Sequence, residues 1–212
     1  MLENIAKVLF VQITIERRSN LKIEDIGEVT VGVILSRVKA KPGEEHVKIP
    51  ILTIQDLNRE TGDYSIEEEI TVEEINPNKY NNELLSHKGM VVIGITSYKA
   101  FVIDENYIGR VIPSYFAIVD LDKEKVDPYY FNWYFNEEES VKKQLTIAKQ
   151  GSSIKSLSVQ MLRELEIDVP SIEIQKKIGK IYYLRKLKEK KVYEKGILER
   201  TLINSLLKRK VR

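Results

Sequence analysis

The feature that most constrains the fold of this chain is a continuous helical pattern over its last part, residues 171–212. Ser171 is suited to cap such a helix, and Gly196 weakens it by about 1 kcal/mol relative to alanine. A helix of about 40 residues is roughly 60 Å long, too long to pack wholly on a small domain. Its apolar residues recur at steps of three and four, which places them along one stripe: Ile174, Ile178, Ile181, Leu184, Leu198, Leu202 and Leu206.

The pattern therefore divides the chain into a domain at 1–170 and a long helix at 171–212. Over this length an apolar stripe is typical of a coiled coil or of another pairing between helices. The alternative, in which the helix folds back along its own domain, stays open. The length and the charge of the helix favour the first interpretation.

Charge is distributed unevenly along the chain. Residues 176–212 hold 14 Lys or Arg and three Glu, a local balance of +11. Of the totals of 34 basic and 32 acidic residues, this leaves 20 basic and 29 acidic residues for 1–175, a balance of −9. The basic helix is suited to bind nucleic acid or an acidic partner. Much of the acidity lies in residues 59–74, "RETGDYSIEEEITVEE", which indicates a solvated face or loop.

Composition excludes several classes of protein. A chain of 212 residues with 42% hydrophobic and 31% charged residues is typical of a soluble globular protein. It contains no cysteine, so neither a disulfide framework nor a thiolate metal site is expected, and His46 and His87 alone do not close a zinc site. No apolar run approaches 18 residues, and "VLFVQITI" is a poor signal peptide. We therefore expect a cytoplasmic protein with no membrane segment and no metal.

The order of the periodic segments predicts an α+β fold, with strands in the middle of the chain and helices towards its ends. A helix is expected over about 1–18 and a basic-then-acidic loop over 36–46. Asp127 is suited to cap an aromatic amphipathic helix that continues to Gln150. A short helix is expected near 157–165. Strands are expected within 28–35, 47–57, 90–104 (two strands about a "TSYK" turn), 107–122 and 166–170.

Motifs for catalysis are absent from the sequence. It contains no GxxxxGK[ST] phosphate loop, no GxGxxG and no HExxH pair. The segment "VDPYYFNWY" only loosely resembles a methyltransferase motif, and capping by Asp127 explains it adequately. Carboxylate–lysine spacings of the nuclease type arise readily in a chain so rich in charge. We therefore predict no catalytic residues, and the chain is expected not to be an enzyme.

Several segments, taken in order, point to a family. These are "IGEVTVGVILSRVKAK", "VKIPILTIQDL", "LLSHKGMVVIGITSYKAFVID" and "GRVIPSYFAIVDLDKEKVDPYYFNWYFN". The most specific is "AKQGSSIKSLSVQMLRELEIDVPSIEIQKKI", in which a Gly-Ser turn, a short Leu-containing helix and an apolar strand ending at Pro170 precede a helix start with Glu173 and Gln175. Over about 21–190, the chain resembles the DNA-specificity (S) subunit of type I restriction–modification systems.

The resemblance implies a β-rich target recognition domain with flanking helices at 1–170 and a coiled-coil spacer helix at 171–212. An S subunit usually has two recognition domains separated by two long helices, whereas this chain has one of each and looks like a half-subunit. The resemblance therefore implies a homodimer through the helix that reads a bipartite site in double-stranded DNA. It assigns no catalysis or cofactor to this chain. S-adenosylmethionine and ATP belong to the methyltransferase and restriction subunits, its implied partners.

Residues that read DNA are expected in loops, where they supply donors to base edges and cations to phosphates. Arg110 is a further candidate, with a surface salt bridge as its alternative. The aromatic residues of 129–135 are expected in the core. For each loop an ordinary solvated loop is the alternative. The loop candidates are Ser36, Arg37, Lys39 and Lys41; Thr96, Ser97, Tyr98 and Lys99; and Lys149, Gln150, Ser152, Ser153 and Lys155.

Two functions of different classes remain. The first is a sequence-specific DNA-binding specificity subunit that reads half of a bipartite target and directs the methyltransferase and restriction subunits to it. The second is a non-catalytic coiled-coil adaptor that keeps the recognition fold without binding DNA, which the acidic domain makes conceivable. The dependence of DNA affinity on salt distinguishes them, because only the first neutralises phosphates.

Overall fold

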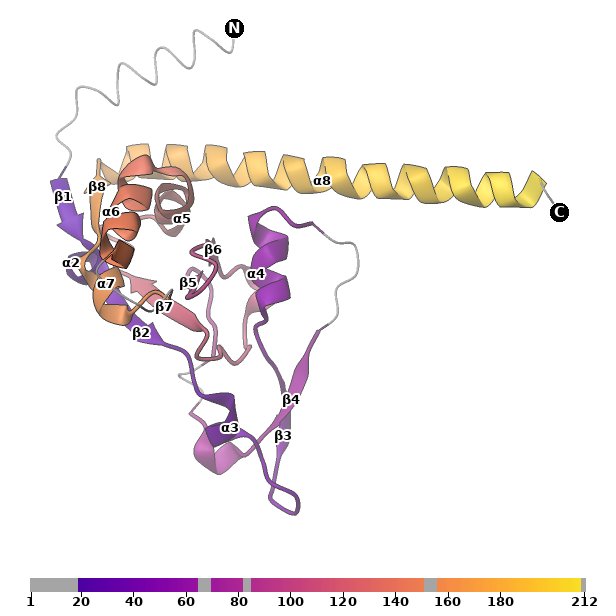
Figure 1. The fold of residues 1–212 in the computed structure, drawn as a ribbon, viewed down its shortest axis with the longest axis horizontal. Coiled ribbons are helices and arrows are strands. Elements are labelled where there is room, and N and C mark those ends of the chain that lie inside the picture. The colour runs from indigo at the N-terminus through magenta and orange to yellow at the C-terminus, as the bar shows by residue number, and fades with distance from the viewer. Residues whose placement is uncertain (1–18, 65–69, 82–84, 151–155, 211–212) are drawn as a thin grey trace, which may run out of the picture.

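The computed structural model describes residues 19–64, 70–81, 85–150 and 156–210. It shows a lobe of mixed strands and helices from which one long helix, α8 (Ile172–Lys210), projects well beyond the lobe (Figure 1). The α+β class and the long C-terminal helix expected from the sequence are therefore confirmed. The helix expected over about 1–18 lies outside the described residues.

The centre of the lobe is a four-stranded antiparallel sheet in the order β2-β7-β5-β6. All residues of β5, one of its two inner strands, are buried, because other elements cover both faces of the sheet there. This explains why "VVIG" is a continuous apolar run and not an alternating one. The two strands expected about the "TSYK" turn are β5 and β6. The strands of this sheet are β2 (Gly27–Val31), β5 (Val91–Gly94), β6 (Ala100–Val102) and β7 (Phe116–Leu121).

The core lies on both sides of this sheet. On one side, Val91, Ile93 and Val119 pack against Phe131 and Tyr134 of helix α5 (Pro128–Glu137). On the other side, Leu57 of helix α4 (Ile54–Thr61) packs with a cluster that contains Phe101 and Phe116. The expectation that the aromatic residues of 129–135 are mainly core residues agrees with the burial of Tyr130, Phe131, Tyr134 and Phe135.

Helix α5 begins at the expected cap. Oδ1 of Asp127 accepts hydrogen bonds from the backbone N–H groups of Tyr129 (3.0 Å) and Tyr130 (2.9 Å). The expectation of one helix to Gln150 was wrong, because Glu138 has an extended backbone and a second helix, α6 (Glu139–Gln150), follows it. The break lets the chain turn, so that residues of both helices belong to the same core cluster.

A short two-stranded sheet joins the start and the end of the lobe. Strand β1 (Ser19–Lys22) pairs antiparallel with β8 (Glu166–Val169), the strand that leads into α8. The short helix α7 (Val159–Glu164) precedes β8, as expected from the sequence, and Ser158 Oγ accepts a hydrogen bond from Met161 N at 3.1 Å. Helix α2 (Ile23–Ile26) connects β1 to β2.

The rest of the lobe is a unit built from β3 (Val47–Pro50), α4 and β4 (Val72–Ile75). Strands β3 and β4 form a separate two-stranded sheet that reaches away from α8, while α4 lies between this sheet and α8 (Figure 1). The single strand expected over 47–57 was wrong in its second half. Thr53 and Asp56 form a capping box, with Thr53 N to Asp56 Oδ2 at 2.8 Å, so the chain turns into a helix there.

Within the described residues, three further one-turn helices connect the strands of the lobe. They are α3 (Leu35–Val38), η1 (Pro77–Lys79) and η3 (Glu105–Tyr107). Helix α3 begins one residue before the segment 36–46, which was expected to be a loop throughout. Within the part of the chain that the structure describes, no helix is long and apolar enough to cross a membrane.

Helix α8 is fastened to the lobe at its first turns. Gln175 is buried, and its side chain accepts a hydrogen bond from Asp127 N (2.9 Å) and donates to the carbonyl oxygens of Lys125 and Pro170. One turn later Gly179 meets the start of α5. A Cβ on Gly179 would lie 2.7 Å from Tyr130 N, so only glycine permits this approach.

Candidate nucleic-acid interface

The first candidate segment, residues 36–41, follows the end of β2 and leads away from the central sheet. Gly32 lies directly against the backbone of the crossing segment, since a Cβ there would be 2.3 Å from the carbonyl oxygens of Ile112 and Pro113. Val33 then accepts a hydrogen bond from Ser114 N at 2.8 Å. The absence of a side chain at Gly32 therefore sets the direction in which α3 leaves the sheet.

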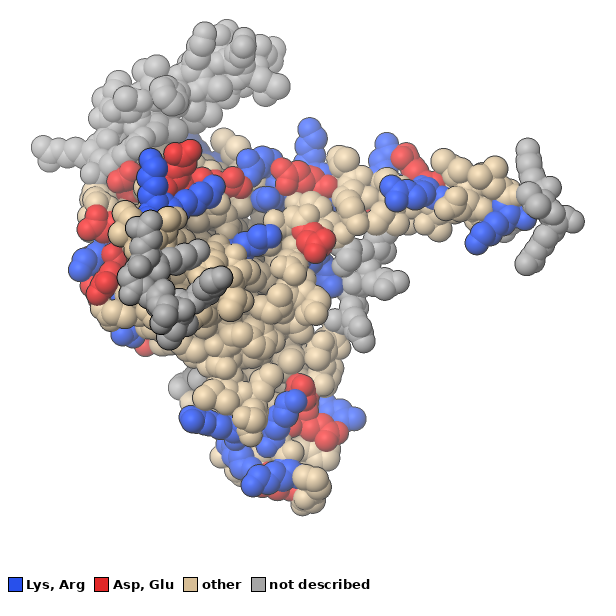
Figure 2. All heavy atoms as spheres, in the orientation of Figure 1, with Lys and Arg blue, Asp and Glu red and all other residues tan. Residues whose placement is uncertain are grey.

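We use the name tip for α3, residues 39–46 and the paired strands β3 and β4. Lys and Arg side chains gather there, at the end of the lobe away from α8 (Figure 2). Of the predicted residues, Ser36, Arg37 and Lys41 are exposed. Lys39 forms an ion pair with Glu73 at 2.8 Å, so part of its charge is already neutralised within the tip.

Acidic residues of the tip offset part of its positive charge, and they also hold its backbone in place. Glu44 accepts hydrogen bonds from Lys79 Nζ (2.8 Å), Asn76 Nδ2 (2.9 Å) and Lys41 N (3.0 Å). These donors, with Lys79 the strongest, lower the pKa of Glu44 to about 2. Glu44 therefore stays ionised and holds the turn at 41–44 in place, which orients the exposed Lys41.

The second candidate segment is the turn between β5 and β6. Tyr98 N donates to Gly94 O at 3.0 Å and Gly94 N to Lys99 O at 2.9 Å, and Tyr98 has a left-handed backbone with φ of 55°. The ring of Tyr98 packs against the main core cluster, whereas Thr96 and Lys99 are exposed. The turn thus presents Thr96 and Lys99 outward, with Ser97 partly buried beside them.

Backbone hydrogen bonds bring the candidate segments into one continuous row. Ser114 N donates to Val33 O, beside α3, and the adjacent Tyr115 O accepts from Ile95 N of the turn at 3.1 Å. Ile95 O in turn accepts from Leu157 N at 3.0 Å, just after residues 151–155. We call this arrangement the loop row: α3, residues 113–115, residues 95–99 and residues 156–157.

Residues 113–115 were missed by sequence reasoning, although they occupy the middle of the loop row. Tyr115 is exposed at its edge, and its hydroxyl donates to Leu52 O at 2.9 Å. The available signal was Pro113 directly before an apolar strand, which is typical of a turn that enters a strand. The sequence offered no indication that this turn lies between the two predicted loops, because the contact is long-range.

Arg110 lies apart from the exposed candidates. It is buried and pairs with the buried Asp56 at 3.3 Å, and it also donates to Asn106 O at 2.9 Å. Its guanidinium lies 4.6 Å from the centre of the Tyr107 ring. Arg110 therefore forms a salt bridge, which was the alternative to a DNA contact. The salt bridge lies inside the lobe and not on its surface.

The third candidate segment is only partly described. Lys149 and Gln150 are the last two residues of α6, and the structure does not describe their side chains. Ser152, Ser153 and Lys155 lie outside the described residues. What the structure does place is Leu157, whose hydrogen bond to Ile95 sets the end of this segment beside the turn.

The predicted apolar stripe of α8 divides into two parts. Ile174 is 8% exposed and Ile178 packs against the main core cluster, so both contact their own lobe. The remaining residues of the predicted stripe are exposed, with Leu198 at 63%. The near end of α8 thus agrees with the alternative in which the helix packs on its domain. The exposed part of the stripe is Ile181, Leu184, Leu198, Leu202 and Leu206.

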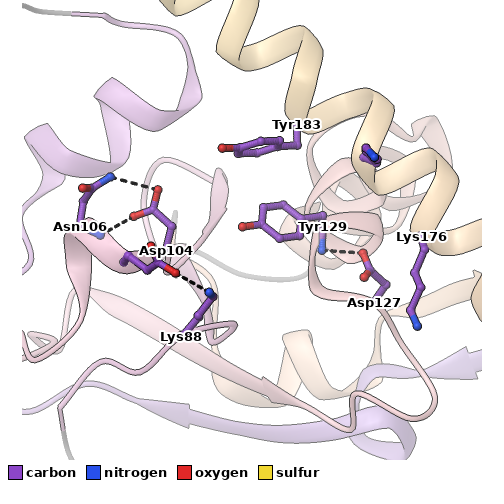
Figure 3. Close-up of a pocket in the computed structure, with 9 residues that line it drawn as sticks. Lys88, Asp104, Asn106, Asp127, Tyr129, Lys176 and Tyr183 are labelled. Atoms are coloured by element: carbon purple, nitrogen blue, oxygen red, sulfur yellow. Dashed lines mark hydrogen bonds and ion pairs between the residues drawn. The ribbon is translucent and has the colours of Figure 1, made fainter.

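A cavity of about 580 Å³ lies between α8, the start of α5 and η3 (Figure 3). The rings of Tyr129 and Tyr183 meet edge to face at 5.3 Å, and Lys88 pairs with Glu105 at 2.6 Å, which lowers the pKa of that carboxyl. Among the described residues that line the cavity, none belongs to the predicted DNA-contact set. Nor do the described ranges contain a group of three His, Cys, Asp or Glu able to hold a metal ion.

Similar folds occur in solved structures. The S subunit of the type I restriction–modification system from M. genitalium is 15% identical with a TM-score of 0.55, and the match covers 92% of this chain and 46% of that one. The HsdS subunit from Thermoanaerobacter tengcongensis is 14% identical with a TM-score of 0.54, and the match covers 87% of this chain and 48% of that one. A third chain comes from a structure described as the structural basis of complex assembly and conformational transition of the type I R-M system. It is 14% identical with a TM-score of 0.57, and the match covers 89% of this chain and 49% of that one.

At these identities the likeness shows the fold alone, and this chain spans about half the length of the solved chains it matches. No curated protein matched the sequence significantly. The model of one protein family, described as the type I restriction modification DNA specificity domain, matches residues 18–199. Because that match covers most of the lobe and most of α8, the chain belongs to the family of type I restriction modification DNA specificity domains.

Proposed function

We propose that this chain reads one half of a bipartite DNA target and directs the methyltransferase and restriction subunits of a type I complex to it. The observation that carries the proposal is the loop row, in a chain that belongs to the specificity-domain family. Within the loop row, α3 and the turn at 95–99 are far apart in sequence and present exposed hydroxyl groups and cations on one sheet. This is the arrangement that reading base edges and neutralising phosphates requires.

Within this proposal each part of the molecule has a separate task. The recognition domain comprises residues 1–170, and residues 171–212 form the spacer helix. Arg37, Lys41 and Lys99 supply exposed cations for phosphates, while Ser36 and Thr96 supply hydroxyl groups for base edges or the backbone. The chain is a specificity subunit and not an enzyme, which family membership supports. Methylation with S-adenosylmethionine and ATP-driven cleavage are the tasks of the partner subunits.

We further propose that two copies pair through α8. The exposed stripe forms one apolar patch near the lobe (Ile181 and Leu184) and another near the end of the helix (Leu198, Leu202 and Leu206). Leu184 and Leu202 are 18 residues apart, about 27 Å along the helix. An antiparallel second copy with a two-fold axis at the level of Tyr193, midway between Leu184 and Leu202, covers each near patch with the far patch of the other copy.

Fluorescence anisotropy of a labelled duplex tests the DNA-binding proposal. Affinity is expected to fall linearly with salt on logarithmic axes between about 50 and 200 mM, because bound phosphates release counterions. The experiment includes the methyltransferase subunit, so that a site completed by the partner is not missed. A flat response, or no binding at low salt, would instead support the coiled-coil adaptor.

Sedimentation of the full chain tests the pairing proposal. Leu198→Asp with Leu202→Asp is expected to convert a dimer into a monomer, because two carboxylates would be buried in an apolar interface. Ile147→Asp is the matched control, since Ile147 is an equally exposed isoleucine on α6 and lies off α8. A dimer that survives the double substitution would exclude pairing through this stripe.

A further inference from the structure

Helix α8 contacts the lobe beyond the point where α5 supports it. Arg185 pairs at 2.6 Å with Glu137, the last residue of α5. From there to Tyr193 the contacts come from the other side of the lobe, through Glu60 on α4 and Tyr64 just after it. These two residues extend the supported length of α8 by about 12 Å, or two turns.

The contacts of Glu60 and Tyr64 are specific in geometry. Glu60 Oε1 lies 3.4 Å from Lys190 Nζ. The hydroxyl of Tyr64 donates to Glu189 Oε2 at 3.2 Å, and its ring lies 6.0 Å from that of Tyr193. Burial, followed by the nearby Glu189, raises the pKa of Tyr64 to about 12, so its proton stays available for this hydrogen bond. We call Glu60, Tyr64, Glu189, Lys190 and Tyr193 the clasp.

The clasp is anchored in the core of the lobe. The buried Tyr107 donates from its hydroxyl to the same Glu60 Oε1 at 2.9 Å, and the ring of Tyr107 packs edge to face with Phe101 at 5.3 Å. The Glu60–Lys190 pair is also largely shielded, with side-chain exposures of 26% and 22%. It therefore differs from an ordinary surface ion pair, whose freely moving partners hold nothing in place.

Past Tyr193, the described part of α8 leaves the lobe. Nothing lies within 4 Å of the position that a Cβ on Gly196 would occupy, and Leu198 and Leu202 are exposed. The segment from Tyr193 to Lys210 is about 26 Å long. A tilt of about 10° where it leaves the lobe would move its end by about 4.5 Å, more than the rise of about 3.4 Å for one base pair.

We propose that the clasp fixes the direction in which the distal half of α8 leaves the lobe and thereby selects the separation of two DNA half-sites. The second part of this statement rests on the proposed function, whereas the first does not. Glu60 and Tyr64 act as positioning residues, because they touch neither the loop row nor the exposed stripe. They determine which target spacings a pair of lobes can read.

Spin labels measure the direction of α8 directly, and the absence of native cysteines makes labelling site-specific. Labels are introduced through Lys143→Cys on α6 and Arg200→Cys on α8, and labelled chains are diluted in unlabelled chains so that only distances within one chain are recorded. The clasp variant, Glu60→Gln with Tyr64→Ala, is expected to broaden and shift the distance distribution. Lys191→Gln with Glu194→Gln is the control, because it removes a 2.8 Å ion pair within the same helix without touching the lobe.

A distribution unchanged in the clasp variant, or changed equally in the control, would overturn the proposal. Circular dichroism verifies that both variants keep their helix content, so that a broad distribution reports a loosened α8 and not an unfolded one. Duplexes that differ only in half-site spacing then test the consequence. The native chain is expected to prefer one spacing and the clasp variant to lose that preference while a single half-site binds unchanged. Loss of all DNA binding in the native chain would contradict the proposed function and leave the distance result standing.

Discussion

Arg110 and Asp56 form a buried ion pair, with 3.3 Å between Arg110 Nη1 and Asp56 Oδ2. The same carboxylate accepts hydrogen bonds from Thr53 N and Oγ1 and from Arg59. It thus joins the start of α4 to the segment that follows η3. Through this carboxylate the unit of β3, α4 and β4 is connected to the rest of the lobe.

Arg110→Ala is expected to lower the free energy of unfolding by about 3 kcal/mol, because it leaves Asp56 as a buried carboxylate without its second cation. Urea denaturation measures this change. Arg37→Ala is the control, since Arg37 is exposed, and it is expected to alter stability by less than about 0.5 kcal/mol. Equal effects of the two substitutions would mean that the internal pair contributes nothing to the fold.

Two glycines of α8 give opposite predictions. Alanine is ordinarily preferred to glycine within a helix by about 1 kcal/mol. Gly196→Ala is expected to raise the free energy of unfolding by most of this amount, because nothing lies within 4 Å of its Cβ position. Gly179→Ala is expected to destabilise the protein despite the same gain, because its Cβ would clash with Asp127 and the backbone of Tyr130. Chemical denaturation of both variants measures the difference, and a stabilised Gly179→Ala would contradict the close contact of α8 with α5.

The tip is expected to lose stability in acid through Glu44. The pKa of Glu44 in the folded protein is about 2, below its usual value of 4.5. Ionised Glu44 therefore stabilises the fold above about pH 4.5, and this contribution is lost as the pH falls from there towards about 2. Glu44→Gln is expected to remove this part of the pH dependence, as measured by denaturation at a series of pH values. Glu45→Gln serves as the control and should leave the profile unchanged.

The exposed cations of α3 and its turn are expected to bind phosphates. Arg37→Ala with Lys41→Ala should weaken DNA binding and reduce the slope of log affinity against log salt by about 2, because each phosphate that is no longer neutralised lowers the slope by about 1. Lys88→Ala is the control, because Lys88 lines the cavity beside α8 and lies outside both the tip and the loop row. A slope that the double substitution leaves unchanged would remove the tip from the DNA interface.

Local signals in the sequence predicted local structure well. The Asp127 cap, the "TSYK" turn and the terminal helix each depend on residues close together in the chain, and the structure contains all three. The strand expected over 47–57 failed at Thr53 because a capping box competes with strand propensity there, and its spacing of three residues was readable in the sequence.

Relationships between distant residues could not be predicted in this way. Nothing near Arg110 indicates that Asp56 is its partner, because 54 residues separate them and only the folded lobe brings them together. The same holds for Ser114 and Tyr115, which become part of the candidate interface through hydrogen bonds to Val33 and Ile95. The stripe of α8 was correctly placed on a helix, but its periodicity gave no indication that Ile174 and Ile178 face the lobe.

The clasp ends the support of α8 at Tyr193, and this has a consequence for proteolysis. Lys195, Arg200 and Lys208 are exposed on a length of helix that the lobe does not hold, so local unraveling there is less costly than within the lobe. Trypsin should therefore trim the chain from its far end and slow down near Lys190, which is bound to Glu60. A protected far end in solution would show that another molecule has covered it, and limited digestion would thus report assembly without any label.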